Sequence, residues 1–89
     1  MFKKFLRKFK RYDLDEMKDL QEVSRNIGKN IRSYKKAKDN GNLFGQYGLA
    51  YAIANGLVYI EEYYPLEAYV AIYSAFEEDL KEIHELLNK

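Results

Sequence analysis

The stretch from Asn40 to Ile60 contains no charged residue, although 33% of the residues of the whole chain are charged. Such a window is just long enough to span a bilayer as a helix. Gln46, Asn55 and several glycines inside it make a spanning segment unfavourable. We therefore predict that this stretch is a central helix of a water-soluble bundle, buried on most of its sides.

The dipeptide Asn55-Gly56, which stands between two apolar runs, is also typical of a β-hairpin turn. Alanines at positions 50, 52 and 54 oppose that interpretation, because alanine favours helices and is depleted in strands. Residues 47–64 are accordingly predicted to be helical, and a hairpin remains the alternative.

Small residues recur at steps of three and four residues in the same stretch. On a helix they share one face, where the missing side chains let another backbone come close. We predict that this is a helix-packing or dimer face, made of Gly45, Gly48, Ala52 and Gly56.

A long helix is predicted to precede the uncharged stretch. Asp13 and Glu16 have the spacing of a capping box, which places the first helical residue at Leu14. Apolar positions then follow at alternating steps of three and four, as in the seam of a helical bundle. The positions are Met17, Leu20, Ser24, Ile27, Ile31 and Tyr34. The run Asp39-Asn40-Gly41-Asn42 is a helix stop signal.

Another helix is predicted from Pro65 to the C-terminus, because proline suits a first helical turn. Its seam is unbroken and consists of Leu66, Tyr69, Tyr73, Phe76, Leu80, Ile83 and Leu87. These patterns predict an all-α fold: a small antiparallel helical bundle of three core helices plus an N-terminal basic amphipathic helix. A chain of 89 residues has room for one domain, which we assign to residues 1–89.

The charges of the chain are divided between its two halves. Residues 1–38 hold thirteen Lys and Arg against five acids, and residues 39–89 hold two Lys against nine acids. In an antiparallel bundle the basic end of the 14–39 helix and the acidic end of the last helix would lie together and partly neutralise one another. If the chain from Pro65 to its C-terminus forms one helix, the acidic residues of that helix stand near its C-terminal end, where the helix dipole disfavours them.

Residues 1–12 are predicted to form the basic amphipathic helix. Phe2, Phe5, Leu6 and Phe9 share one face, and the cations share the other. Two interpretations stay open: the phenylalanines dock on the bundle, or the segment binds a membrane or another polyanion. The candidate residues for membrane or polyanion binding are Phe2, Lys3, Lys4, Phe5, Arg7, Lys8, Phe9, Lys10 and Arg11.

The sequence lacks the groups that most catalytic sites need. The chain has no cysteine and one histidine, His84, whose neighbours on a helix include neither a carboxylate nor a second imidazole. The acidic runs lie off the apolar seams and are expected to be solvated. We predict no enzymatic activity, no catalytic residue, no metal site and no cofactor.

Nine tyrosines make an interaction surface the better hypothesis, because tyrosine is enriched at interfaces. The predicted protein-binding patch brackets Pro65 and consists of Tyr59, Glu61, Glu62, Tyr63, Glu67, Tyr69 and Tyr73. The alternative is that these tyrosines cap the core.

The function predicted from these features is that of a non-enzymatic, cytoplasmic protein-interaction module that binds, blocks or bridges another macromolecule. A protein partner is expected, and a homodimer is possible. The small size and the content of Lys, Asn, Tyr and Ile suit an inhibitor encoded by a virus or a plasmid. The alternatives are peripheral membrane binding through residues 1–11 and nucleic-acid binding through the basic residues 1–38.

Overall fold

The computed structural model of the chain describes residues 14–89. Every element in this part is a helix: α2 (Leu14–Asp39), α3 (Leu43–Tyr63), α4 (Leu66–Ala75) and α5 (Glu77–Leu87). The all-α prediction is thereby confirmed, and the hairpin alternative for residues 47–64 is excluded. The helix predicted over residues 1–12 lies outside the described residues.

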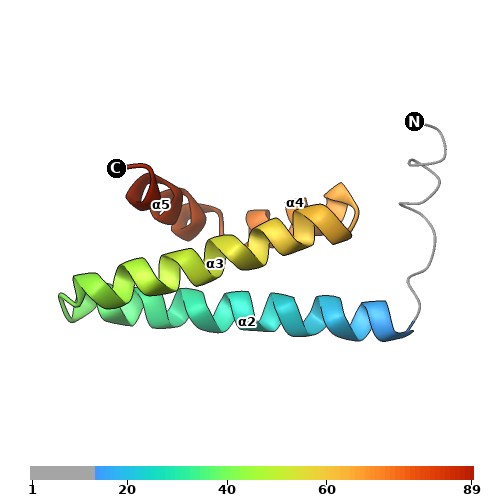
Figure 1. Cartoon of the computed structure of the whole chain (residues 1–89), viewed down its shortest axis with the longest axis horizontal. Coiled ribbons are helices and arrows are strands. Elements are labelled where there is room, and N and C mark those ends of the chain that lie inside the picture. Colours follow the sequence, from blue (N-terminus) through green and yellow to red (C-terminus); the bar gives the residue numbers. More distant parts are fainter. Residues whose placement is uncertain (1–13) are drawn as a thin grey trace.

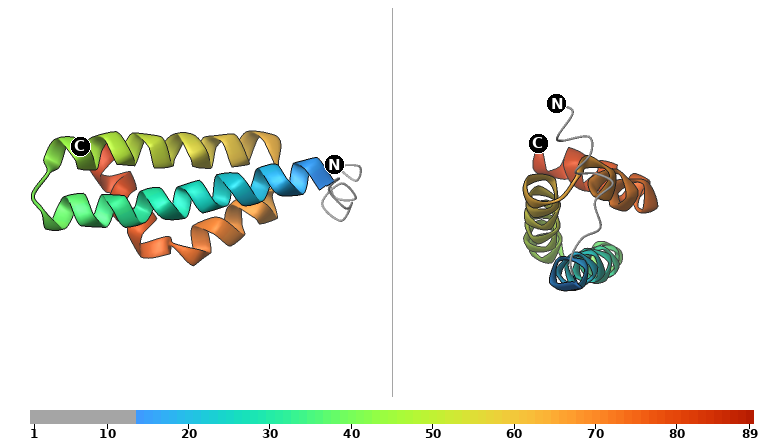
Figure 2. Two further views of the ribbon diagram at one scale, coloured as in Figure 1. Left: turned by 90° about the horizontal axis from the view of Figure 1, so that it is seen from below. Right: turned by 90° about the vertical axis from the view of Figure 1, so that its right-hand side faces the viewer.

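The helices form a small three-sided bundle. α2 and α3 make a long antiparallel hairpin, and α4 and α5 return along one side of it (Figure 1). Seen end-on, the three sides are α2, α3 and the α4–α5 pair (Figure 2). This arrangement agrees with the predicted antiparallel bundle.

The hairpin between α2 and α3 is made by local signals in the sequence. α2 carries Asp15 and Glu16 in its first turn and Lys36 and Lys38 in its last turn, as the helix dipole favours. Gly41 then has a φ of +69°, a left-handed conformation that glycine adopts without strain. The next helix starts at once, because the side chain of Asn42 accepts a hydrogen bond from the Gly45 amide at 2.9 Å.

The core lies between α2, α3 and α5. The predicted seams supply most of it, since three of its eight buried residues come from α2, three from α3 and two from α5. They are Ile27, Ile31, Tyr34, Ala50, Ile53, Ile60, Leu80 and Ile83. The first residue of each seam is not covered, because Met17 is 45% exposed and Leu66 is 57% exposed.

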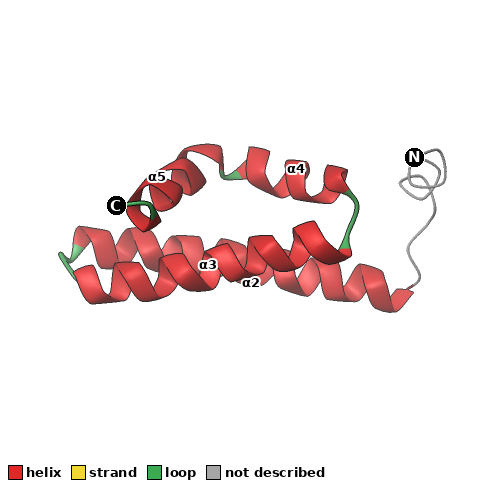
Figure 3. Ribbon diagram, turned by 45° about the horizontal axis from the view of Figure 1, so that its top comes forward, coloured by secondary structure: helices red, strands yellow, loops and turns green. Residues whose placement is uncertain are grey.

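The prediction of one continuous helix from Pro65 to the C-terminus is wrong. Phe76, with φ −128° and ψ 30°, ends α4 and precedes α5 (Figure 3). Neither glycine nor proline marks this break, so its origin is tertiary. The Phe76 ring packs on Gly28, which is buried in α2, and a Cβ atom on Gly28 would lie 3.5 Å from its tip.

The break changes the electrostatics of the acidic run. Glu77, Glu78 and Asp79 stand in the first turn of α5, where the helix dipole favours carboxylates. The arrangement that looked unfavourable for a single long helix is therefore favourable in the folded chain.

The expectation that the uncharged stretch is buried on most sides is also wrong. α3 buries Ala50, Ile53 and Ile60 on one side, whereas Phe44 and Tyr51 on the opposite side are 92% and 59% exposed. A single side of the hairpin is covered by α4 and α5, so the far side of α3 faces solvent.

Candidate protein-binding surface

α3 exposes a continuous face along most of its length, which we call the outer face. Its members share one side of the helix and lie opposite the buried Ile53 and Ile60. They are Phe44, Gly48, Tyr51, Ala52, Asn55, Val58, Tyr59 and Tyr63, and each is exposed. None carries a formal charge at neutral pH. Glu62, three residues after Tyr59 and also exposed, adds a carboxylate at the C-terminal end of this side, so the face is aromatic, apolar and uncharged as far as Tyr59.

The structure divides the four small residues predicted to form a packing face. Gly56 packs inside the fold, because a Cβ atom there would lie 2.9 Å from Cγ1 of Ile27. Gly45 lies against the side chain of Asn42, its own helix cap. Gly48 and Ala52 are exposed, and a Cβ atom on Gly48 would meet nothing within 4 Å. One of the four thus brings two helices of the chain together, and two lie on the outer face.

Two of the predicted interface tyrosines extend the outer face towards the end of α3. The rings of Tyr59 and Tyr63 lie with centroids 4.9 Å apart. Tyr59 is 38% exposed and Tyr63 is 68% exposed. The Tyr59 hydroxyl donates a hydrogen bond to the Asp19 carboxylate of α2 at 2.8 Å, which holds this ring in one orientation.

Tyr64, which was not among the predicted interface residues, joins the same cluster. Its hydroxyl donates hydrogen bonds to the Asp19 carboxylate and to the Glu16 carbonyl oxygen, and its ring centroid is 6.2 Å from that of Tyr59. The hydrogen bonds from Tyr64 and Tyr59 lower the pKa of Asp19. The carboxylate thus ties the end of α3 to the start of α2.

The other two predicted tyrosines belong to a separate group. Tyr69 and Tyr73 stack on one another on α4, with centroids 5.9 Å apart, and both are partly buried against the core. Burial raises the pKa of Tyr69, with a smaller effect from Glu61. Among residues 14–89 no ring contact joins this pair to Tyr59 or Tyr63. The predicted patch is therefore split, and its acids Glu61, Glu62 and Glu67 are exposed around the α3–α4 turn.

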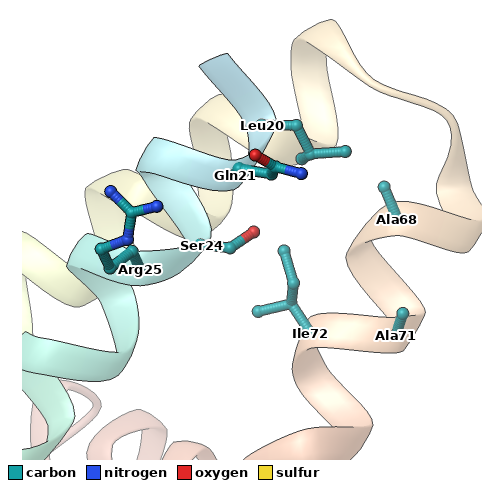
Figure 4. A pocket seen from close by; sticks show the side chains of 7 residues that line it. All are labelled: Leu20, Gln21, Ser24, Arg25, Ala68, Ala71 and Ile72. Carbon is teal, nitrogen blue, oxygen red and sulfur yellow. The ribbon is translucent and has the colours of Figure 1, made fainter. Parts of the chain in front are cut away.

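Two shallow grooves flank α2. The smaller has a volume of about 280 Å³ and runs between α2 and α3, where Ala52, Asn55 and Tyr59 form one of its walls. It borders the outer face directly. The larger has a volume of about 580 Å³ and lies between α2 and α4 (Figure 4).

Carboxylates of α5 neutralise part of the basic end of α2. Lys38 contacts Glu82 at 2.5 Å, and Lys35 lies 3.7 Å from Asp79. Tyr34 donates a hydrogen bond to the same Glu82 at 3.0 Å. Burial and this bond raise the pKa of Tyr34 to about 12, and the bond from Lys38 lowers the pKa of Glu82. The predicted neutralisation between the two ends is confirmed, and it leaves fewer free cations there for a polyanion.

The candidate residues for membrane or polyanion binding between Phe2 and Arg11 lie outside the described residues. Within residues 14–89, no group of three His, Asp or Glu side chains is placed to hold a metal ion. His84 is exposed on α5. None of the four described helices combines the length and the hydropathy that crossing a membrane requires.

Three exposed side chains of the outer face were not predicted from the sequence: Phe44, Tyr51 and Val58. They recur every seven residues, but α3 is apolar all around, so its periodicity does not distinguish the covered side from the exposed side. Comparisons of the chain with protein-family models, with curated proteins and with solved structures found no match.

Proposed function

We propose that this protein is a non-enzymatic interaction module that binds another protein through the outer face of α3 and thereby blocks or bridges it. The observation that carries the proposal is the exposure of Phe44, Tyr51 and Val58 in a row on α3, which has no charged residue before Glu61. Exposed apolar patches on small soluble domains mark interaction sites.

The composition of the outer face matches the centre of a protein interface. Such centres are depleted in charged residues and enriched in aromatic residues. The outer face provides Phe44, Tyr51, Tyr59 and Tyr63, and the nearest acids, Glu61 and Glu62, stand at its end as a polar rim. A partner that covers this face loses few charge–water contacts.

The shape of the outer face also suits a protein partner. Gly48 and Ala52 leave a low section beside Tyr51, on the side of the face that borders the groove between α2 and α3. A partner helix or strand could approach the α3 backbone at this section, with the large side chains of Phe44 and Val58 on either side. Gly48 and Ala52 thus take the role predicted for the small-residue face, directed outwards.

The class of protein that we propose is a small inhibitor encoded by a virus or a plasmid. The two grooves beside α2 are open and neither forms an enclosed active-site cavity. Binding that blocks a surface of a larger protein needs no such cavity. A cytoplasmic location belongs to the same proposal.

Photo-crosslinking tests the proposal. The tagged chain, with p-benzoylphenylalanine in place of Tyr51, is produced in the cells that encode it and irradiated. We expect one abundant protein adduct at this position and none when the label replaces Lys29, an exposed residue of α2. Absence of an adduct at position 51 would contradict the proposal.

A matched pair of variants separates recognition from folding. Val58 on the outer face and Val70 on α4 are 50% and 49% exposed. Val58→Glu is expected to abolish the adduct, and Val70→Glu to leave it unchanged, with equal helical content in both variants. Equal effects of the two substitutions would show that the outer face is not the binding site. An adduct of twice the mass of the chain would identify the partner as a second copy.

A further inference from the structure

The groove between α2 and α4 is apolar and uncovered in the described part of the chain. Leu20, Ser24 and Arg25 line it from α2, and Ala68, Ala71 and Ile72 line it from α4 (Figure 4). Leu20, Ala68 and Ile72 also pack on the core, so the floor of the groove is a continuation of the core. A segment that fills the groove would extend the bundle by one helix.

The half of the bundle that contains this groove has a strong negative charge. Residues 14–25 and 57–75 hold seven carboxylates and two cations, Lys18 and Arg25. The carboxylates are Asp15, Glu16, Asp19, Glu22, Glu61, Glu62 and Glu67. Asp15, Glu22, Glu61, Glu62 and Glu67 form no ion pair with the cations of residues 14–89, whose ion pairs all involve α5. This half therefore has a net charge of −5, whereas the rest of the described chain has seven cations and six acids.

The chain itself supplies a segment of opposite charge at this half of the bundle. Residues 1–13 carry six cations and one acid, a net charge of +5, and they are joined to the first residue of α2. Attachment to the acidic half keeps the segment at a high local concentration there. Charge complementarity thus favours the chain's own N-terminal segment as the occupant of the groove.

The length of the segment also fits. Leu20 lies about 9 Å along α2 from Leu14, and the groove extends about 7.5 Å further to Arg25, at 1.5 Å per helical residue. A helix over residues 2–9 spans about 10 Å, and residues 10–13, at up to about 3.3 Å each when extended, remain to reverse the chain and to reach the level of Leu20. Phe2, Phe5, Leu6 and Phe9 would then face the groove, and the cations would face solvent and the carboxylates around it.

We infer that residues 1–11 fold back onto the bundle, with a helix over residues 2–9 in the groove between α2 and α4 and its phenylalanines on Leu20, Ala68 and Ile72. This intramolecular docking goes beyond the proposed function and uses a different surface. It also opposes membrane binding by the same segment, because an anionic bilayer would compete with the groove for the phenylalanines and would meet the carboxylates of this half of the bundle.

Paramagnetic broadening in solution tests the inference on the full chain. The sequence has no cysteine, so Lys8→Cys provides a single position for a nitroxide. Lys8 lies on the polar side of the segment and leaves the phenylalanines intact. We expect the backbone amide signals of Ser24 and Ala71 in the groove to be broadened and to recover when the nitroxide is reduced. The amide of Tyr51 on the outer face should stay sharp. Full intensity at Ser24 and Ala71 would overturn the inference.

One double variant and one matched pair of single variants control for charge and folding. Phe5→Ser with Phe9→Ser keeps the charge of the segment and is expected to abolish the broadening. Ala71→Lys places a cation in the groove, and Ser74→Lys places one on the same helix outside the residues that line it. Both positions are exposed, so both variants should fold. Loss of broadening in Ala71→Lys but not in Ser74→Lys supports docking, and equal effects contradict it.

Two further experiments test other binding modes of the N-terminal segment, to a second copy of the chain and to a membrane. Nitroxide-labelled chain is mixed with isotope-labelled chain that has no nitroxide, and broadening of Ser24 in that mixture would mean exchange of the segment between copies instead of intramolecular docking. Flotation with vesicles of phosphatidylserine and phosphatidylcholine, compared with phosphatidylcholine alone, tests the membrane. Binding to the anionic vesicles that requires Phe5 and Phe9, together with sharp groove signals, would also overturn the inference.

Discussion

A Cβ atom on Gly56 would lie 2.9 Å from Cγ1 and 3.2 Å from Cδ1 of Ile27, a residue that is only 2% exposed. Gly56 is thus the point of closest approach between α3 and α2 among the glycines of α3. Gly48 belongs to the same helix and has no neighbour within 4 Å of that position. The two glycines provide an internal comparison of packing and helix propensity.

We predict opposite effects of alanine at these two positions. Gly48→Ala should stabilise the fold by up to about 1 kcal/mol, because alanine is the better helix former and nothing obstructs its methyl group. Gly56→Ala gains the same propensity but overpacks the buried Ile27, and overpacking costs roughly 1–3 kcal/mol. Its net effect should be destabilising. Urea denaturation measures both free energies of unfolding, and stabilisation by Gly56→Ala would contradict the close packing.

The cap of α3 gives a second prediction. Asn42→Ala removes the side-chain oxygen that accepts from the Gly45 amide, and the loss of such a cap destabilises by about 1 kcal/mol. Asn55→Ala changes an exposed asparagine within the same helix and should be neutral or slightly stabilising. Thermal denaturation followed by circular dichroism compares the two. A lower midpoint in Asn55→Ala than in Asn42→Ala would refute the assigned start of α3.

The hydrogen bonds of Tyr64 give a third prediction. Tyr64→Phe removes the hydroxyl that donates to Asp19 and Glu16, and we expect a loss of about 0.5–1.5 kcal/mol in the free energy of unfolding. Tyr63→Phe makes the same chemical change in a side chain that is 68% exposed and should cost little. Urea denaturation of both variants at neutral pH is the measurement. Equal losses would show that Asp19 does not hold the end of α3.

The ion pair between Lys38 and Glu82 gives a prediction about pH. The pKa of Glu82 is lowered in the folded chain, so its contribution is present above its ordinary pKa of 4.5 and is lost as the pH falls through the lower folded value. Glu82→Gln should therefore destabilise the protein at pH 7, by up to about 1 kcal/mol for a pair this exposed. This difference from the unsubstituted chain should vanish at low pH, where Glu82 itself is protonated.

The measurement is the free energy of unfolding of both proteins across the acidic range. Glu85→Gln is the matched control, because Glu85 is exposed on the same helix and forms no ion pair with the other residues of 14–89. Its effect should be small at every pH. A difference for Glu82→Gln that persists or grows at low pH would show that the carboxylate is not held in its charged form.

Part of the candidate surface could be predicted from the sequence. The uncharged stretch, its helical state and the exposed tyrosines Tyr59 and Tyr63 were all accessible there, because composition and spacing are local properties. The exposure of Phe44, Tyr51 and Val58 was not accessible. On a helix that is apolar all around, the covered side depends on which side α4 and α5 take.

The sequence by itself determined where α2 ends and where α3 begins, since Gly41, Asn42 and the basic last turn of α2 act within a few residues of the backbone that they influence. The tertiary structure decided the break at Phe76, because the ring packs on the buried Gly28 from a different helix. The tertiary structure also gave Gly56 and Gly48 different surroundings. Their local sequence patterns are equivalent, and only Gly56 lies against Ile27, so distance to another helix determines the role of each.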